Sequence, residues 1–113
     1  DVIDYPFCTE KIFRNIKYKK PFIVMGQRYT LASLRKLGYK TFTPLIDESY
    51  DECAYTKERV AAVIKELEGL KSMSNNEWVS FLDKCKPILE HNYDNLLKRV
   101  KQTNDWLEGL KNL

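Results

Sequence analysis

The chain has 113 residues and a formal net charge of +3, and 43% of its residues are hydrophobic. This length suits a single domain, and no apolar run approaches the roughly 18 residues of a membrane-spanning helix, so we expect no entry into a membrane. The cysteines, Cys8, Cys53 and Cys85, are far apart and only one histidine is present, which excludes a zinc-ligand spacing. We expect reduced thiols, a cytoplasmic location and no metal site.

The charge is unevenly distributed along the chain. Residues 1–40 carry nine Lys/Arg and three Asp/Glu, a net charge of +6, whereas residues 41–113 carry ten and thirteen, a net charge of −3. A local excess of positive charge suits a phosphate-bearing partner, and it also suits a solvated basic face. Composition leaves both interpretations open.

The first predicted element is a helix over residues 10–19. Thr9 is a suitable N-cap, and the apolar residues Ile12 and Ile16 recur at helical spacing. Pro21 cannot continue a helix and ends the pattern.

A strand, a second helix and a second strand are predicted next. The apolar run at 22–25, Phe-Ile-Val-Met, is typical of a strand buried on both faces, and Gly26 allows a tight turn or the close approach of a ligand to the backbone. A helix over 31–37 is followed by Gly38 at a C′ position, and residues 39–42 form a second short strand. The pattern predicts an α/β fold with partial Rossmann-like βα units and short parallel strands.

The second half of the chain is predicted to be helical. An acidic loop over 43–55 precedes an amphipathic helix from Thr56 to about Leu70. Residues 74–77, Ser-Asn-Asn-Glu, match a capping box and open another helix, which Pro87 should kink or whose boundary it should shift. A last helical segment is expected over about 93–112.

These elements predict one domain in two parts, 1–55 and 56–113. Two short parallel strands do not make a stable sheet. The apolar strand at 22–25 would therefore need neighbouring strands that the chain does not supply. We therefore interpret 1–113 as a fragment of a larger α/β chain, or as a chain whose sheet is completed by a partner.

The chemistry of the first helix centres on Glu10 and Lys11. A helix N-terminus presents free N–H groups and a positive dipole end, which suit an anion. A carboxylate accepts hydrogen bonds from ribose hydroxyls, and an ammonium pairs with phosphate, so a nucleoside diphosphate would use both groups. The alternative is structural, with Thr9 as cap, Glu10 favoured by the helix dipole and Lys11 solvated.

The segment DYPFCTEKIFRNIKYKKPFIVMG resembles the nucleotide-sugar-binding signature of α-1,3-fucosyltransferase-like glycosyltransferases. The resemblance implies a two-domain GT-B architecture in which 1–55 would form the nucleotide-sugar-binding part. It further implies that Glu10 contacts the ribose and Lys11 the diphosphate. The candidate ligand-binding residues are Tyr5, Thr9, Glu10, Lys11, Arg14, Asn15 and Gly26.

The resemblance departs from the family pattern in ways that shape the expected function. Three residues rather than one separate Tyr5 from Thr9, a Lys-Tyr-Lys-Lys run replaces a small-residue stretch, and only about 40 residues match. The acceptor domain, where the family places its catalytic base, has no counterpart, so no catalytic residue is assigned. The expected function is donor binding by part of a glycosyltransferase, with a nucleoside diphosphate sugar as substrate and no cofactor. The following segment also resembles glycosyltransferase-like proteins of phages and bacteria.

Two other function classes remain open at this stage. A nucleic-acid-binding module is suggested by interleaved basic and aromatic residues: Lys17, Tyr18, Lys19, Lys20, Arg28, Tyr29, Arg35 and Lys36. A helical protein-interaction module would instead use the C-terminal helices as its binding surface. The acidic cluster Asp47, Glu48, Asp51 and Glu52 is interpreted as a solvated loop or helix start, in preference to a divalent-ion site.

Overall fold

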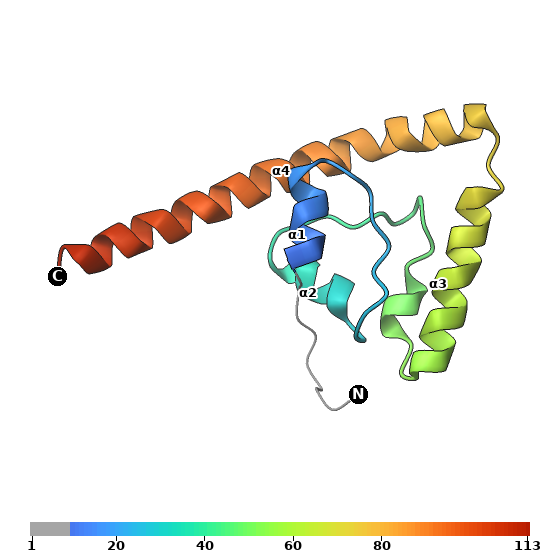
Figure 1. The fold of residues 1–113 in the computed structure, drawn as a ribbon, viewed down its shortest axis with the longest axis horizontal. Helices are drawn as coiled ribbons and strands as arrows, with labels where there is room; N and C mark the ends of the chain where they lie inside the picture. The colour runs from blue at the N-terminus through green and yellow to red at the C-terminus, as the bar shows by residue number, and fades with distance from the viewer. Residues whose placement is uncertain (1–9) are drawn as a thin grey trace.

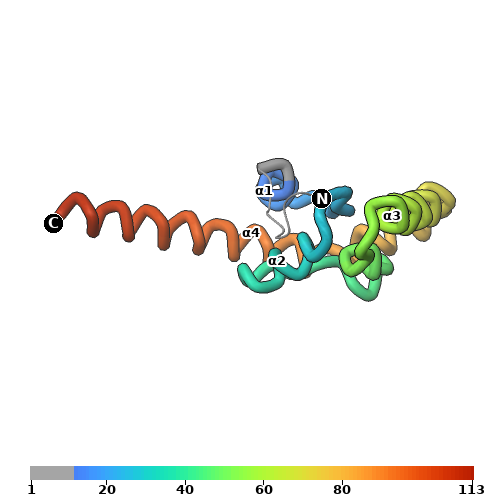
Figure 2. Tube along the Cα trace, turned by 90° about the horizontal axis from the view of Figure 1, so that it is seen from below, coloured from blue at the N-terminus to red at the C-terminus, as the bar shows by residue number. Residues whose placement is uncertain are grey.

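The computed structural model describes residues 10–113 and consists of helices joined by loops. Four α-helices and one 3₁₀-helix are found in this part of the chain. Figure 1 shows α1 against the middle of α4 with α2 below it, and α3 running away from the beginning of α4, to which a short loop joins it. The second half of α4 extends away from everything else, and Figure 2 shows it emerging from a flat arrangement of the other helices. The elements are α1 (Glu10–Lys17), α2 (Thr30–Lys36), the 3₁₀-helix η1 (Ser49–Glu52), α3 (Thr56–Lys71) and α4 (Asn75–Lys111).

The predicted α/β class is wrong, because residues 10–113 contain no β-strand. Phe22, Ile23 and Val24 of the first predicted strand pack into the core without a sheet, whereas Met25 is exposed. Phe22 is buried edge-on against Phe42, with 5.1 Å between the ring centroids, and the Val24 N–H donates to the Tyr50 hydroxyl at 3.3 Å. The prediction of burial therefore holds for Phe22, whereas the strand pairing and the Rossmann-like units do not.

The second predicted strand, 39–42, has no neighbouring strand among the described residues. Side chains form hydrogen bonds with its backbone groups instead. The Asn92 amide accepts from the Lys40 N–H at 2.7 Å and donates to the Lys40 carbonyl at 2.9 Å, so it satisfies both backbone groups of that residue. The Phe42 N–H donates to the buried Glu48 carboxylate at 3.0 Å. Buried backbone groups need partners, and here a carboxylate and an amide supply them in place of a ladder.

The first helix is confirmed, but it ends at Lys17 rather than at residue 19. Lys19 adopts a left-handed conformation with φ 54°, and the Lys20 N–H closes the helix end on the Asn15 carbonyl at 2.9 Å. Ile12 and Ile16 are buried where α1 packs against α4. The amphipathic pattern therefore predicted the packed face correctly, and chain reversal at Lys19 set the end.

The predicted glycine at the end of the second helix is also confirmed. Gly38 has φ 92°, a conformation that favours glycine, and its N–H donates to the Arg35 carbonyl at 3.0 Å. An added Cβ there would meet the Asn95 side chain at 3.0 Å. Gly38 thus allows α4 to approach the chain closely.

The two last predicted helical segments form one helix of 37 residues, α4. Its capping box is confirmed: the Glu77 N–H donates to Ser74 Oγ at 3.2 Å, and the Ser74 N–H donates to Glu77 Oε1 at 3.1 Å. These bonds from Ser74 hold the pKa of the Glu77 carboxyl below its usual value. Pro87 lies inside α4 and does not end it.

The core joins every element but stops part-way along α4. Phe81, Cys85 and Asn92 are the buried residues of α4, whereas every residue from Leu97 onward is exposed. Among residues 10–113, none of the helices combines the length and apolarity needed to cross a bilayer. The buried hydrophobic residues are Ile12, Ile16, Phe22, Leu31, Leu34, Tyr39, Phe42, Ile46, Tyr50, Val63, Phe81 and Cys85.

Candidate functional site

The candidate ligand-binding residues fall on α1 and on the loop before α2. Tyr5 and Thr9 lie outside the described residues, and only the backbone of Glu10 and Lys11 is described. The Arg14 side chain is exposed and makes no hydrogen bond or ion pair with the residues that the structure describes, while the Arg14 carbonyl accepts from the Tyr18 N–H at 3.1 Å. Asn15 is half-buried. The exposed surface of α1 is therefore on the side opposite Ile12 and Ile16.

The backbone of Gly26 is bound by the side chain of Arg59, which belongs to α3, and not by α1. Its carbonyl accepts from Arg59 Nη1, and Arg59 Nη2 also reaches the Cys53 carbonyl at 3.4 Å. A guanidinium at this carbonyl fixes the loop before α2 onto α3. No hydrogen bond between Gly26 and α1 is found among the described residues, so the structure does not join these two parts of the signature.

The N-terminus of α2 is filled by a carboxylate of the chain. Asp51 Oδ1 accepts from the Leu31 N–H at 2.8 Å, and Asp51 Oδ2 accepts from the Ala32 N–H at 3.1 Å. Thr30 is the first residue of the helix, and its hydroxyl donates to the Gln27 carbonyl at 2.7 Å. The N-terminus of a helix suits an anion, and at α2 the Asp51 carboxylate takes the free N–H groups.

Glu48 is a second buried carboxylate with several donors. It accepts from the Phe42 N–H, from the Thr43 N–H at 3.1 Å and from the Thr43 hydroxyl at 2.5 Å. Its cationic partner is Arg35, with Nη2 at 3.2 Å from Oε1. Because every bond is made within the chain, Glu48 shapes the loop before η1 and is not available to a ligand.

Asp51 and Glu48 are the residues that sequence reasoning missed. The interpretation of the acidic cluster as solvated is wrong for both, since their exposed fractions are 3% and 6%. Only their crowding in a short acidic stretch was visible in the sequence, and that pattern does not show which backbone groups they face. Within residues 10–113, no group of three metal-ligating side chains is found.

Tyr50 lies beside these carboxylates and is almost fully buried. Burial raises the pKa of its hydroxyl far above the ordinary value, and the negative charges of Glu48 and Asp51 add to this, whereas the bond from the Val24 N–H acts in the opposite direction. A tyrosine held neutral in this way serves as a hydrogen-bond partner inside the fold.

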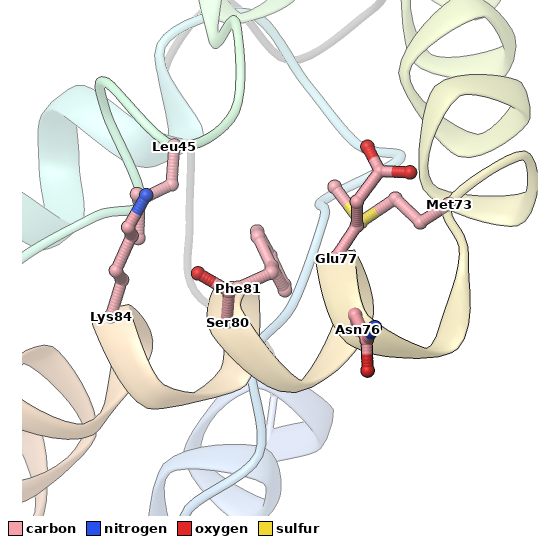
Figure 3. A pocket seen from close by; sticks show the side chains of 7 residues that line it. All are labelled: Leu45, Met73, Asn76, Glu77, Ser80, Phe81 and Lys84. Carbon is pink, nitrogen blue, oxygen red and sulfur yellow. The ribbon is translucent and has the colours of Figure 1, made fainter.

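A hollow of about 440 Å³ lies at the beginning of α4, where Leu45 and Met73 face the first helical turns (Figure 3). Its floor is the ring of Phe81, which stacks on Trp78 at 5.5 Å between centroids. The carboxylate of Glu77 is used by the capping box, and the Lys84 side chain is exposed. No arrangement of nucleophile, base and orienting group occurs among its lining residues, which are Leu45, Met73, Asn76, Glu77, Ser80, Phe81 and Lys84.

The basic and aromatic residues expected of a nucleic-acid module are partly engaged within the chain. Lys19 bonds Glu90 at 3.2 Å and lies 4.7 Å from the centroid of the Tyr93 ring. Arg28 stacks on Tyr29 at 4.5 Å. Arg35 pairs with Glu48, as described above. Because these cations have partners within the described residues, the basic and aromatic residues do not form a continuous surface of unpaired cations and exposed rings.

No protein-family model, curated protein or solved structure matches this chain. The similarity to glycosyltransferases thus rests on the signature residues alone.

Proposed function

We propose that this chain binds the nucleoside diphosphate part of a sugar donor at the start of α1, as one portion of a glycosyltransferase-like protein. The observation that supports this proposal is the packing of α1. Ile12 and Ile16 are buried, and the Arg14 side chain on the opposite side of the helix is exposed and has no partner among the described residues. Residues three and four apart are neighbours on a helix, so position 14 stands next to positions 10 and 11. Positions 10, 11 and 14, which hold a glutamate, a lysine and an arginine, therefore share one side of the helix.

The proposed chemistry follows from these three groups. Glu10 accepts hydrogen bonds from the ribose hydroxyls, while Lys11 and Arg14 neutralise the diphosphate. Arginine suits this role because its planar fork can bind two phosphate oxygens at once. The base for transfer would come from another domain or chain, so we propose that these residues bind the donor without turning it over alone.

A cytoplasmic setting is part of the same proposal. Cys53 and Cys85 are free thiols, and Cys85 is fully buried. Burial raises the pKa of the Cys85 thiol, which keeps it protonated and unreactive. Free thiols are typical of a reducing compartment, where nucleotide sugars are also at hand.

Calorimetric titration with GDP, UDP and ADP tests the proposal. We expect at least one of them to bind, and we expect Arg14→Ala and Lys11→Ala each to weaken binding about tenfold, since a charge-assisted hydrogen bond is worth about 1.5–3 kcal/mol. Lys57→Ala is the matched control, because Lys57 is an exposed cation on α3. Absence of binding in the millimolar range, or equal affinities for all three variants, would overturn the proposal.

A nucleic-acid ligand is the rival outcome of the same experiment. Fluorescence anisotropy with short oligonucleotides across a salt series would then show binding that weakens as salt rises, since phosphate contacts release counterions. Such binding without any affinity for free nucleotides would replace the donor-binding proposal.

A further inference from the structure

The exposed side of α1 continues beyond Arg14 and ends in a tyrosine. Positions 11, 14, 15 and 18 hold Lys, Arg, Asn and Tyr, and positions with this spacing form one stripe along a helix. Tyr18 follows the last residue of α1, but its N–H donates to the Arg14 carbonyl at 3.1 Å, so position 18 stays on the helical path. The stripe therefore runs the whole length of α1.

The Tyr18 ring has free surface for a ligand. Its exposed fraction is 56%, and the Lys17 ammonium lies over the ring at 5.5 Å from the centroid. The face of an aromatic ring is electron-rich, which is why it attracts a cation. The same face suits the C–H groups on one side of a sugar ring, which are apolar and carry a small positive charge.

Asn15 lies beside Tyr18 on the stripe and offers hydrogen-bonding groups. Its side chain is half-buried, and the side-chain amide makes no hydrogen bond with the residues that the structure describes. Its main chain is fixed, because the Asn15 main-chain carbonyl accepts from the Lys20 N–H at 2.9 Å. An amide donates and accepts at once, so it suits the hydroxyls of a sugar.

The order of the groups along α1 determines which part of a nucleotide sugar lies near Tyr18. The diphosphate of such a ligand stands between the ribose and the sugar. With the ribose at Glu10 and the diphosphate at Lys11 and Arg14, the sugar lies towards the end of α1. Arg14 and Tyr18 are about one helical turn apart, a rise of about 6 Å. The sugar is bonded directly to the diphosphate, so its ring can reach Tyr18.

We infer that the sugar ring of the donor stacks on the Tyr18 ring and that the Asn15 amide binds its hydroxyls. The inference rests on the proposed function, which places the nucleoside diphosphate at the start of the same stripe. It makes Tyr18 and Asn15 the residues that recognise the sugar. The ligand is then a complete nucleotide sugar, held along the length of α1.

The nucleobase is the other planar group of the donor that can stack on a tyrosine. The base is bonded to the ribose, on the side away from the diphosphate, and positions 10 and 18 are separated by a rise of about 12 Å. A ribose at Glu10 therefore directs the base away from Tyr18. The two arrangements differ in their ligands, because a stacked base would need the ring in free nucleotides as well.

Calorimetric titration with matched pairs of ligands tests the inference: GDP with GDP-mannose, UDP with UDP-glucose, and ADP with ADP-glucose. In the pair that binds, we expect Tyr18→Ala to weaken binding of the nucleotide sugar about fivefold, the size expected for the loss of one aromatic contact. Binding of the free nucleotide should change by less than about twofold, because the nucleotide part does not reach the ring. Asn15→Ala should likewise weaken only the nucleotide sugar.

Two control variants and one unfolding measurement accompany these titrations. Tyr18→Phe keeps the ring and should bind both ligands as the native chain does. Tyr55→Ala removes another exposed tyrosine, with an exposed fraction of 69%, and should change neither affinity. Urea unfolding of each variant verifies that the fold is intact.

The outcomes separate the inference from the proposed function. If Tyr18→Ala weakens the free nucleotide as much as the nucleotide sugar, or weakens neither, the sugar does not stack on Tyr18, whereas nucleotide binding still supports the proposed donor site. Free nucleotides that bind while their nucleotide sugars do not would also overturn the inference. Absence of binding by every one of these ligands to the native chain would overturn the proposed function, and the inference with it.

Discussion

The two halves of α4 differ in what surrounds them. Residues 75–96 pack against α1 and the loop at 39–42, with Asn92 almost fully buried at 1% exposure. Residues 97–113 carry the same kind of apolar repeat and bury nothing within the described chain. The comparison shows that amphipathic periodicity determines which face of a helix packs but does not determine what packs against it.

The largest effect expected from the packed region is that of Glu48→Ala. Removal of this carboxylate leaves the Phe42 and Thr43 donors and the Arg35 cation without their partner, at a cost of about 3–5 kcal/mol in the free energy of unfolding. Urea denaturation measures it. Glu52→Ala is the control, because Glu52 is exposed and should change stability by less than about 0.5 kcal/mol. Equal losses for the two variants would mean that Glu48 does not organise the loop.

The next prediction compares the replacement of an asparagine by alanine in the packed half and in the exposed half of α4. Asn92→Ala removes both bonds to the Lys40 backbone and should cost about 2 kcal/mol of unfolding free energy. Asn104→Ala, in the exposed half, should cost less than about 0.5 kcal/mol when the chain is monomeric. Both values come from thermal or urea unfolding at low protein concentration. A loss for Asn104→Ala as large as that for Asn92→Ala would contradict the division of α4 into two halves.

The smallest expected effect is a pH dependence from Tyr50. The folded-state pKa of Tyr50 lies above its ordinary value of 10.0, so its contribution to stability is complete below that pH and is lost as pH rises above it. The unfolding free energy should therefore fall more steeply above pH 10 in the native sequence than in Tyr50→Phe. The variant loses the bond to the Val24 N–H at every pH, so the slope and not the absolute stability is compared. Parallel slopes would contradict the burial of this hydroxyl as the cause.

The helices were largely predictable from the sequence, and the sheet was not. The spacing of Ile12 and Ile16, the glycine at position 38 and the capping box at residues 74–77 act locally, and all three predictions are confirmed. An apolar run such as 22–25 fits a buried strand and a buried loop equally well, because strand pairing depends on distant partners. At 39–42 those partners are the side chains of Asn92 and Glu48, which no local pattern reveals.

The candidate site was predictable only as far as α1. The sequence placed Glu10 in a first helical turn; the structure describes α1 from that residue onward and leaves the Arg14 side chain exposed. It could not show that Arg59 holds the Gly26 carbonyl or that Asp51 fills the N-terminus of α2. Both contacts join residues that are about 20 to 33 positions apart in sequence, so they follow from tertiary packing and not from residue spacing.

The contrast within α4 is tested most directly by hydrogen exchange of its backbone amides at several protein concentrations. We predict that the amides of the packed part, residues 79–96, are protected at every concentration, because opening them requires the body to unfold. The amides of residues 98–111 should exchange rapidly, because these residues are exposed and opening them does not require the body to unfold. Protection of residues 98–111 as strong as that of residues 79–96 would contradict the account.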